Sequence, residues 1–148
     1  MTLHPDLREF LESLNASRVD FVIVGAHALA YHGHPRLTGD IDILVYPSRE
    51  NAERVIQALI QFGFGSLGYV PEDLLTPGDF IQLGVIPNRI DLLNQVSGVS
   101  NDDIWAERIA SHLDNIPVHY IGREHFIRNK RATGRQKDLG DLESLGEI

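Results

Sequence analysis

Two aspartates separated by one residue carry the clearest chemical signal in the sequence. Asp40 and Asp42 lie in the segment Gly39-Asp-Ile-Asp-Ile-Leu-Val45, whose apolar and β-branched residues predict a buried strand over 41–45. Because side chains alternate between the two faces of a strand, both carboxylates are expected on one face. Adjacent carboxylates repel each other and favour a bound cation, and an oxygen-only pair suits Mg²⁺ or Mn²⁺. These ions commonly join a protein carboxylate to substrate phosphates, which is phosphoryl-transfer chemistry.

The residues that precede this pair could bind the phosphates. A short buried strand is expected over 21–24, and Gly25 then allows a tight turn and a close approach of the backbone to a ligand. A helix over 26–31 follows, rich in residues that favour helices. The first N–H groups of a helix lack partners within it and attract anions. We therefore expect the turn at Gly25 and Ala26 to hold phosphates beside a metal ion.

The segment from Val24 to Ile43 resembles the DNA polymerase beta-like nucleotidyltransferase superfamily. The shared pattern is an apolar strand, Gly followed by a small residue, a helix of about a dozen residues, and Asp-apolar-Asp-apolar on the next strand. The lead-in Arg36-x-Thr38-x-Asp40 is similar to that of minimal bacterial members, the subgroup that includes abortive-infection and type IV toxin-antitoxin nucleotidyltransferases. The resemblance implies a minimal nucleotidyltransferase fold of the α/β class, a mixed β-sheet with helices packed on it, in a single domain over 1–148.

The sequence departs from the superfamily pattern at the turn after the first predicted strand. Many catalytic members of this superfamily have Gly-Ser there, with a hydroxyl that touches the triphosphate, whereas this chain has Gly25-Ala26. The backbone donors are retained and the hydroxyl is not, which bears on triphosphate affinity more than on the fold.

The resemblance also implies a third carboxylate on a neighbouring strand. Asp91 lies between Ile90 and Leu92 in a predicted strand over 89–93, where a charge is costly unless it faces a metal or a partner. We assign Asp91 as this third carboxylate, for which the resemblance implies the role of base or metal ligand in activating the acceptor hydroxyl. The alternative is an aspartate on an edge strand that faces water.

Cationic candidates for phosphate binding lie on both sides of the carboxylates. The stretch from Lys137 to Leu142 looks like the Lys-Asp-x-x-Asp-Leu helix that ends many small members of this family. Lys137 could reach the phosphates, with Asp138 or Asp141 orienting it, and Arg36 is a second candidate. The alternatives are ordinary ion pairs on a solvated helix for Lys137 and pairing with a surface acid for Arg36.

Hydrophobic periodicity and turn residues give the order of elements. Between the predicted helices and strands stand glycine- and proline-containing turns. Helices are predicted over 5–15, 26–31, 48–62, 102–110, 123–129 and 136–145, and strands over 21–24, 41–45, 80–86, 89–93 and 118–121.

Composition limits the classes of partner. The net charge of −8 opposes broad electrostatic binding to nucleic acid, although basic residues gather between Arg123 and Lys137 and could hold a triphosphate or a tRNA end. Cysteine is absent, and neither a signal peptide nor a long apolar segment is evident, so we expect a cytoplasmic protein without membrane contact.

The leading hypothesis is a Mg²⁺- or Mn²⁺-dependent enzyme that moves a nucleoside monophosphate from an NTP to an acceptor hydroxyl and releases pyrophosphate. The acceptor could be a tRNA end, a protein or a small molecule. The alternative is a catalytically weak or inactive nucleotidyltransferase-like component of a toxin-antitoxin pair, which acts by binding nucleotide or a cognate toxin or antitoxin protein.

Overall fold

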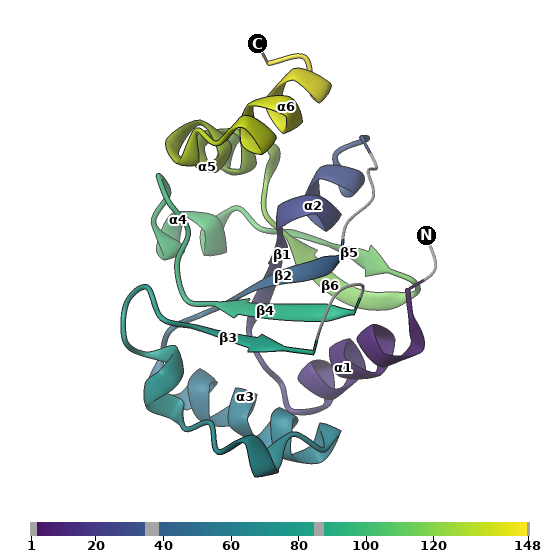
Figure 1. Cartoon of the computed structure of the whole chain (residues 1–148), viewed down its shortest axis with the longest axis vertical. Coiled ribbons are helices and arrows are strands. Elements are labelled where there is room, and N and C mark those ends of the chain that lie inside the picture. Colours follow the sequence, from purple (N-terminus) through teal and green to yellow (C-terminus); the bar gives the residue numbers. More distant parts are fainter. Residues whose placement is uncertain (1–2, 35–38, 85–87, 148) are drawn as a thin grey trace.

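The computed structural model describes residues 3–34, 39–84 and 88–147, which form a mixed β-sheet with helices on both faces (Figure 1). The strand order is β3-β4-β2-β1-β6-β5. Strands β2 and β4 pair in parallel, as do β1 and β6, and the other neighbours are antiparallel. The expected α/β class is therefore confirmed. The strands are β1 (Phe21–Val24), β2 (Asp40–Val45), β3 (Phe80–Leu83), β4 (Arg89–Leu93), β5 (Ile109–Leu113) and β6 (Ile116–Tyr120).

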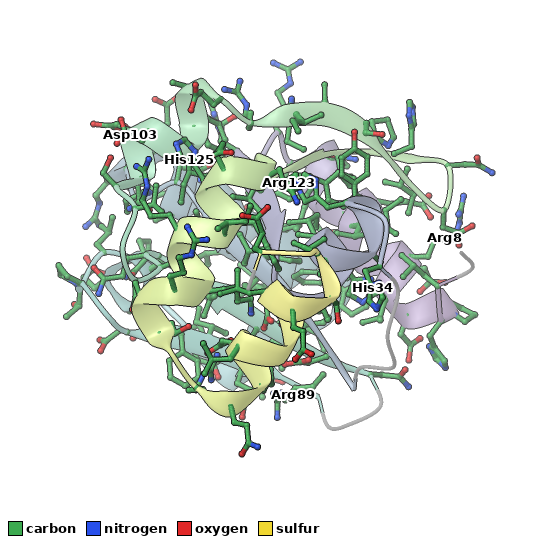
Figure 2. All side chains as sticks on the ribbon, turned by 90° about the horizontal axis from the view of Figure 1, so that it is seen from above. Arg8, His34, Arg89, Asp103, Arg123 and His125 are labelled. Atoms are coloured by element: carbon green, nitrogen blue, oxygen red, sulfur yellow. The ribbon has the colours of Figure 1, made fainter. Side chains whose placement is uncertain are left out.

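The helices form two layers around this sheet. Helices α1 (Pro5–Ala16) and α3 (Arg49–Phe62) pack against each other on one side (Figure 1). On the other side lie α2 (Gly25–Tyr31), α4 (Asn101–Ala106), α5 (Arg123–Thr133) and α6 (Gln136–Ser144). Seen from above, α5 and α6 lie side by side over the sheet (Figure 2).

Side chains of the central strands β2 and β4 alternate between the two faces of the sheet, which separates core isoleucines and a leucine from the aspartates. Ile41 and Ile43 of β2 are buried, and Ile43 pairs with the buried Leu92 of β4. These side chains face the α1 and α3 layer, and each one stabilises the fold by about 2 kcal/mol through burial. The residues that alternate with them along each strand include Asp40, Asp42 and Asp91, and these point to the opposite face. The apolar core thus fixes which face can carry the carboxylates.

Several predicted boundaries differ from the structure. The helix predicted over 102–110 ends at Ala106, and the strand β5 that follows was not predicted. This strand forms a hairpin with β6 through Asp114 and Asn115, whose φ angles of 49° and 65° are typical of a two-residue hairpin turn. The helix predicted over 123–129 continues to Thr133, and Gly134 ends it with a φ of 61°. Of the strand predicted over 80–86, the part from 85 onward lies outside the described residues.

Within the described residues, no helix has both the length and the apolar character needed to cross a lipid bilayer.

One buried amide joins the beginning of β1 to the end of β2. Asn51, in the first turn of α3, is 1% exposed. Its side-chain oxygen accepts a hydrogen bond from the Asp20 amide at 2.7 Å, and its nitrogen donates to the carbonyls of Asp20 and Tyr46 at 2.9 Å each. A buried polar group of this kind stabilises a fold only when its partners are all present. Asn51 therefore fixes α3 against β1 and against β2, the strand that carries Asp40 and Asp42.

We expect Asn51→Ala to lower the free energy of unfolding by about 2 kcal/mol and the melting temperature by roughly 6 °C, since the partly buried hydrogen bond of the Asp20 amide is lost together with the two that Asn51 donates. Urea denaturation followed by circular dichroism measures this. Asn15 is the matched control, because its amide also donates to a carbonyl, that of Pro117, but in an exposed position. Asn15→Ala should change stability by less than about 0.5 kcal/mol, and equal effects of the two variants would contradict the assigned role.

Candidate active site

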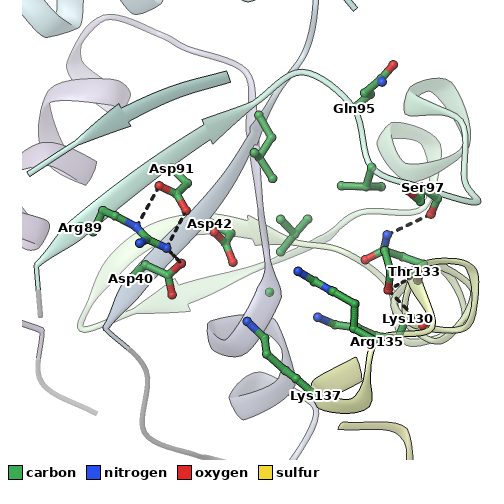
Figure 3. A pocket seen from close by; sticks show the side chains of 15 residues that line it. Asp40, Asp42, Arg89, Asp91, Gln95, Ser97, Lys130, Thr133, Arg135 and Lys137 are labelled. Carbon is green, nitrogen blue, oxygen red and sulfur yellow. Dashed lines mark hydrogen bonds and ion pairs between the residues drawn. The ribbon is translucent and has the colours of Figure 1, made fainter. Parts of the chain in front are cut away.

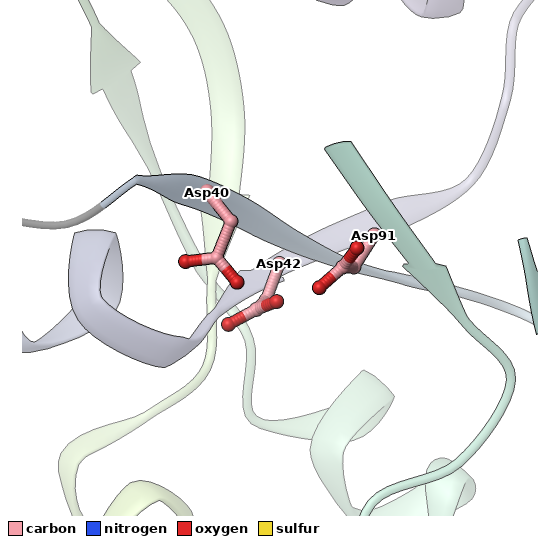
Figure 4. A group of neighbouring side chains, drawn as sticks. All are labelled: Asp40, Asp42 and Asp91. Carbon is pink, nitrogen blue, oxygen red and sulfur yellow. The ribbon is translucent and has the colours of Figure 1, made fainter. Parts of the chain in front are cut away.

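Three aspartates from two adjacent strands converge on one point (Figure 4). In the parallel pairing of β2 with β4, Asp42 lies opposite Asp91 and Asp40 lies opposite Arg89. Each of the three carboxylates offers an oxygen, and these oxygens all lie within 4.8 Å of one another. Asp91 is 8% exposed and β4 lies between β3 and β2, so the alternative of a water-facing residue on an edge strand is wrong.

The carboxylates form one wall of a pocket of about 330 Å³ (Figure 3). Gly25, the first residue of α2, contributes to the same wall, and the facing wall comes from α5 and from the residues that begin α6. Lys137 and Arg135 extend from this second wall toward the carboxylates. The pocket therefore places anionic and cationic groups on opposite sides of one cavity, which suits a ligand that carries both phosphates and a metal ion.

Gly25 is required by the position of Asp42. Its φ of +68° lies in the left-handed region, which other residues adopt at a cost. A Cβ atom at this position would lie 2.2 Å from Oδ2 of Asp42 and 3.0 Å from its Cβ atom. The glycine at the turn thus leaves room for the carboxylate, in addition to allowing close approach of a ligand to the backbone.

The electrostatic environment of Asp42 is unfavourable to its charge. Burial, followed by the negative charges of Asp40 and Asp91, raises the pKa of Asp42 to about 7, and a hydrogen bond with Asp91 adds to this. The positive charge of Lys137 acts in the opposite direction. The three carboxylates offer hard oxygen donors and repel one another. A divalent cation such as Mg²⁺ or Mn²⁺ would suit these donors and relieve the repulsion.

Arg89 is a member of the site that sequence analysis did not identify. Its Nη2 atom lies 2.8 Å from Oδ2 of Asp40 and 3.3 Å from Oδ2 of Asp91. The hydrogen bond with Asp40 raises the pKa of Arg89 above its ordinary value. A signal was present in the sequence, because Arg89 precedes Asp91 by two residues on the same strand and must share its face.

A buried ion cluster supports the cationic wall. Nζ of Lys130 lies 3.1 Å from Oδ1 of Asp138 and 3.4 Å from Oδ2 of Asp141, and all three side chains are almost fully buried. Asp138 also accepts hydrogen bonds from Thr133 and Arg135 at 2.7 Å. Burial would raise the pKa of Asp138, but the hydrogen bonds from Arg135, Thr133 and Lys130 outweigh it and hold the pKa well below its usual range.

This cluster differs from the arrangement expected around Lys137. Asp138 or Asp141 was predicted to orient Lys137, whereas both form ion pairs with Lys130. Lys137 is exposed, lines the pocket and acts electrostatically on Asp42.

Some of the predicted site residues line the pocket and others do not. The structure brings together Gly25, Lys137 and the three aspartates around one pocket. Ala26 is 7% exposed and is not among the described residues that line this pocket. Arg36 lies outside the described residues.

We expect Gly25→Ala to reduce the free energy of unfolding by about 3 kcal/mol, because the new methyl group overlaps Asp42 and the backbone must keep a positive φ. A double-mutant cycle with Asp42→Ala separates the two causes. If the overlap is real, the double variant should recover at least about 1 kcal/mol relative to the sum of the single variants. Strict additivity in chemical denaturation would show that Asp42 is not what excludes a side chain at Gly25.

Asp42 should also impose a pH dependence on the metal-free protein. Its folded pKa of about 7 is above its unfolded value, so its contribution to stability is greatest below pH 4 and is lost as the pH rises toward 7. Asp42→Asn removes this loss. In a buffer with a metal chelator, we expect the variant to exceed the unaltered protein at pH 8 by about 2 kcal/mol, or roughly 6 °C in Tm, with little difference near pH 4. A variant that is less stable at pH 8 would contradict the assigned repulsion.

Comparisons with known proteins identify similar folds. No protein-family model matches the sequence, and no curated protein matches it. Among solved structures, TM1012 of Thermotoga maritima, described as a "putative nucleotidyltransferase", aligns with a TM-score of 0.63 and 16% identity over 96% of this chain and 91% of its own. An antigenic nucleotidyltransferase-like protein of Paracoccidioides brasiliensis aligns with a TM-score of 0.56 and 15% identity over 96% and 73% of the two chains. The chain therefore has a fold similar to those of nucleotidyltransferase-like proteins, as the sequence resemblance implies.

Proposed function

We propose that the protein is a divalent-metal-dependent nucleotidyltransferase. The reaction transfers a nucleoside monophosphate from an NTP to an acceptor hydroxyl and releases pyrophosphate. The observation that carries this proposal is the convergence of Asp40, Asp42 and Asp91 within 4.8 Å, in a pocket whose opposite wall presents Arg135 and Lys137. The nucleotidyltransferase-like fold supports it, because the same pocket lies on a chain with that topology.

The three aspartates would hold Mg²⁺ or Mn²⁺. When bound, this ion supplies positive charge that orients the phosphates and offsets the charge that develops on them. In the transfer step the acceptor oxygen forms a bond to the α-phosphorus, and the bond from that phosphorus to the oxygen it shares with the β-phosphate breaks. The hydroxyl proton passes to a carboxylate, for which Asp91 is the candidate.

The phosphates would lie between the turn at Gly25 and the cations of the opposite wall. Lys137 is exposed and can approach the phosphates as a point charge. Arg135 is held at its Nε atom by Asp138, which fixes the direction of its guanidinium group. With Ala26 in place of a serine, the turn offers backbone donors alone, so Lys137 and Arg135 would supply the cationic contribution to triphosphate binding.

Transfer of label tests the reaction and identifies its acceptor. Each NTP, labelled at the α-phosphate, is incubated with Mg²⁺ or Mn²⁺ and with total tRNA, total protein or candidate small molecules. We expect label in one acceptor class and a loss of at least about 100-fold with Asp42→Asn, because a charge-stabilising group is removed from the site. Asp103, an exposed aspartate at the start of α4, is the matched control, and Asp103→Asn should retain full transfer.

The outcomes separate the two functional hypotheses. Equal transfer by Asp42→Asn and by the unaltered protein would contradict the proposed site. Metal-dependent binding of NTP without label in any acceptor would favour the alternative, a catalytically weak component of a toxin-antitoxin pair that acts on nucleotide or a partner protein. A cognate partner would then be sought by copurification with the unaltered chain.

A further inference from the structure

Arg89 places a permanent positive charge inside the carboxylate cluster. Its Nη2 atom bridges Oδ2 of Asp40 and Oδ2 of Asp91, and its Nε atom lies 3.2 Å from Oδ1 of Asp91 (Figure 3). The side chain of Arg89 is 28% exposed, and those of Asp40 and Asp91 are 17% and 11% exposed. A guanidinium group keeps its charge throughout the physiological pH range. These ion pairs therefore persist unless another group displaces Arg89.

The guanidinium group contacts oxygens that a metal ion would need. The three carboxylates that could hold a cation are Asp40, Asp42 and Asp91, and Arg89 contacts two of them. The ion pairs of Arg89 with Asp40 and Asp91 do not include Asp42. A free divalent cation must thus compete with Arg89 for Asp40 and Asp91, and its net affinity is reduced by the interactions that it breaks.

The fit of Arg89 to the cluster is incomplete. Nε of Arg89 and Oδ1 of Asp91 are both buried and close to each other, yet neither makes an aligned hydrogen bond. This side of the guanidinium group is held by charge attraction alone. It lacks the pair of parallel hydrogen bonds that arginine forms in its strongest carboxylate pairs. Displacement by a better-placed cation therefore breaks fewer good hydrogen bonds than the number of contacts suggests.

We propose that Arg89 is an internal counter-ion that weakens binding of free metal and couples metal binding to nucleotide binding. Arg89 lines the same pocket as Gly25 and Lys137, so a triphosphate in that pocket offers its guanidinium group a new anionic partner. The metal would take the carboxylate oxygens while the nucleotide takes Arg89. By reciprocity, each ligand raises the affinity for the other. This inference rests on the proposed function, because it takes the aspartates as metal ligands.

The test measures binding of Mn²⁺ to the full chain, without turnover. Affinity for Mn²⁺ alone is measured by electron paramagnetic resonance of the unbound ion. Affinity for the α,β-methylene analogues of the four NTPs is measured with and without Mn²⁺. We expect Arg89→Gln to bind Mn²⁺ alone about tenfold more tightly than the unaltered protein, and to lose most of the coupling between metal and nucleotide.

Arg49 provides the matched control. Its guanidinium group also pairs with two carboxylates, Glu72 at 2.7 Å and Glu53 at 3.4 Å, but on an exposed surface outside the pocket. Arg49→Gln should leave Mn²⁺ affinity and coupling unchanged. Arg89→Lys retains a positive charge but loses the guanidinium group that bridges two carboxylates, so we expect it to bind Mn²⁺ about threefold more tightly than the unaltered protein. If Arg89→Gln does not fold, Arg89→Lys replaces it in the test.

The results separate this inference from the proposed function. Mn²⁺ affinity that is unchanged or lower in Arg89→Gln, or in Arg89→Lys where that variant carries the test, would overturn the counter-ion role. If the unaltered protein binds Mn²⁺ and a nucleotide analogue, the proposed function survives this result. Failure of the unaltered chain to bind Mn²⁺ even with every analogue would instead overturn the metal site and, with it, the inference about Arg89.

Discussion

Mutual repulsion among three carboxylates is the constraint on which the rest of the site depends. Ile41, Ile43, Ile90 and Leu92 fill the core on one face of the sheet, so the alternate positions Asp40, Asp42 and Asp91 must share the other. The parallel register brings Asp42 beside Asp91, and burial strengthens their repulsion. Among the described residues, positive charge near the cluster comes from Arg89 within the sheet and from Arg135 and Lys137 across the pocket. Gly25 adds the space that the Asp42 carboxylate needs.

The cationic wall depends on a second and separate electrostatic arrangement. Helix α6 packs mainly against α5, and the Lys130, Asp138 and Asp141 cluster lies between these helices. Buried ion pairs gain little net free energy, but removal of one partner leaves a costly unpaired charge, so such a cluster favours one arrangement of the helices over others. Because Arg135 and Lys137 closely precede Asp138 in the sequence, this arrangement also sets where the two cations enter the pocket. Interactions between charged groups therefore position the side chains on both walls of the pocket.

The sequence predicted the parts of this site that depend on local pattern. The apolar runs of β1, β2 and β4 were visible, and the spacing of Asp40 and Asp42 implied a shared face. Asp91 came from the family resemblance and from its apolar neighbours. The sequence did not show β5, because its alternation is weak and the hairpin turn at Asp114 and Asn115 has no glycine. The burial of Lys130 and the ion pairs of Arg89 result from tertiary contacts, which no local pattern contains.

The proposed counter-ion role of Arg89 would resolve a conflict between the stability of the metal-free fold and the binding of a metal ion. A cluster of three carboxylates with strong affinity for metal would be strongly self-repelling before the metal arrives, and the sheet that carries it would lose stability. Arg89 lowers that repulsion by pairing with Asp40 and Asp91. In the proposed role, this pairing would reduce affinity for the free ion, and the loss would be tolerable where the metal enters with a triphosphate that offers Arg89 a replacement partner. On this proposal, a stable metal-free fold and a metal site that gains affinity when nucleotide binds would be two consequences of the same guanidinium group.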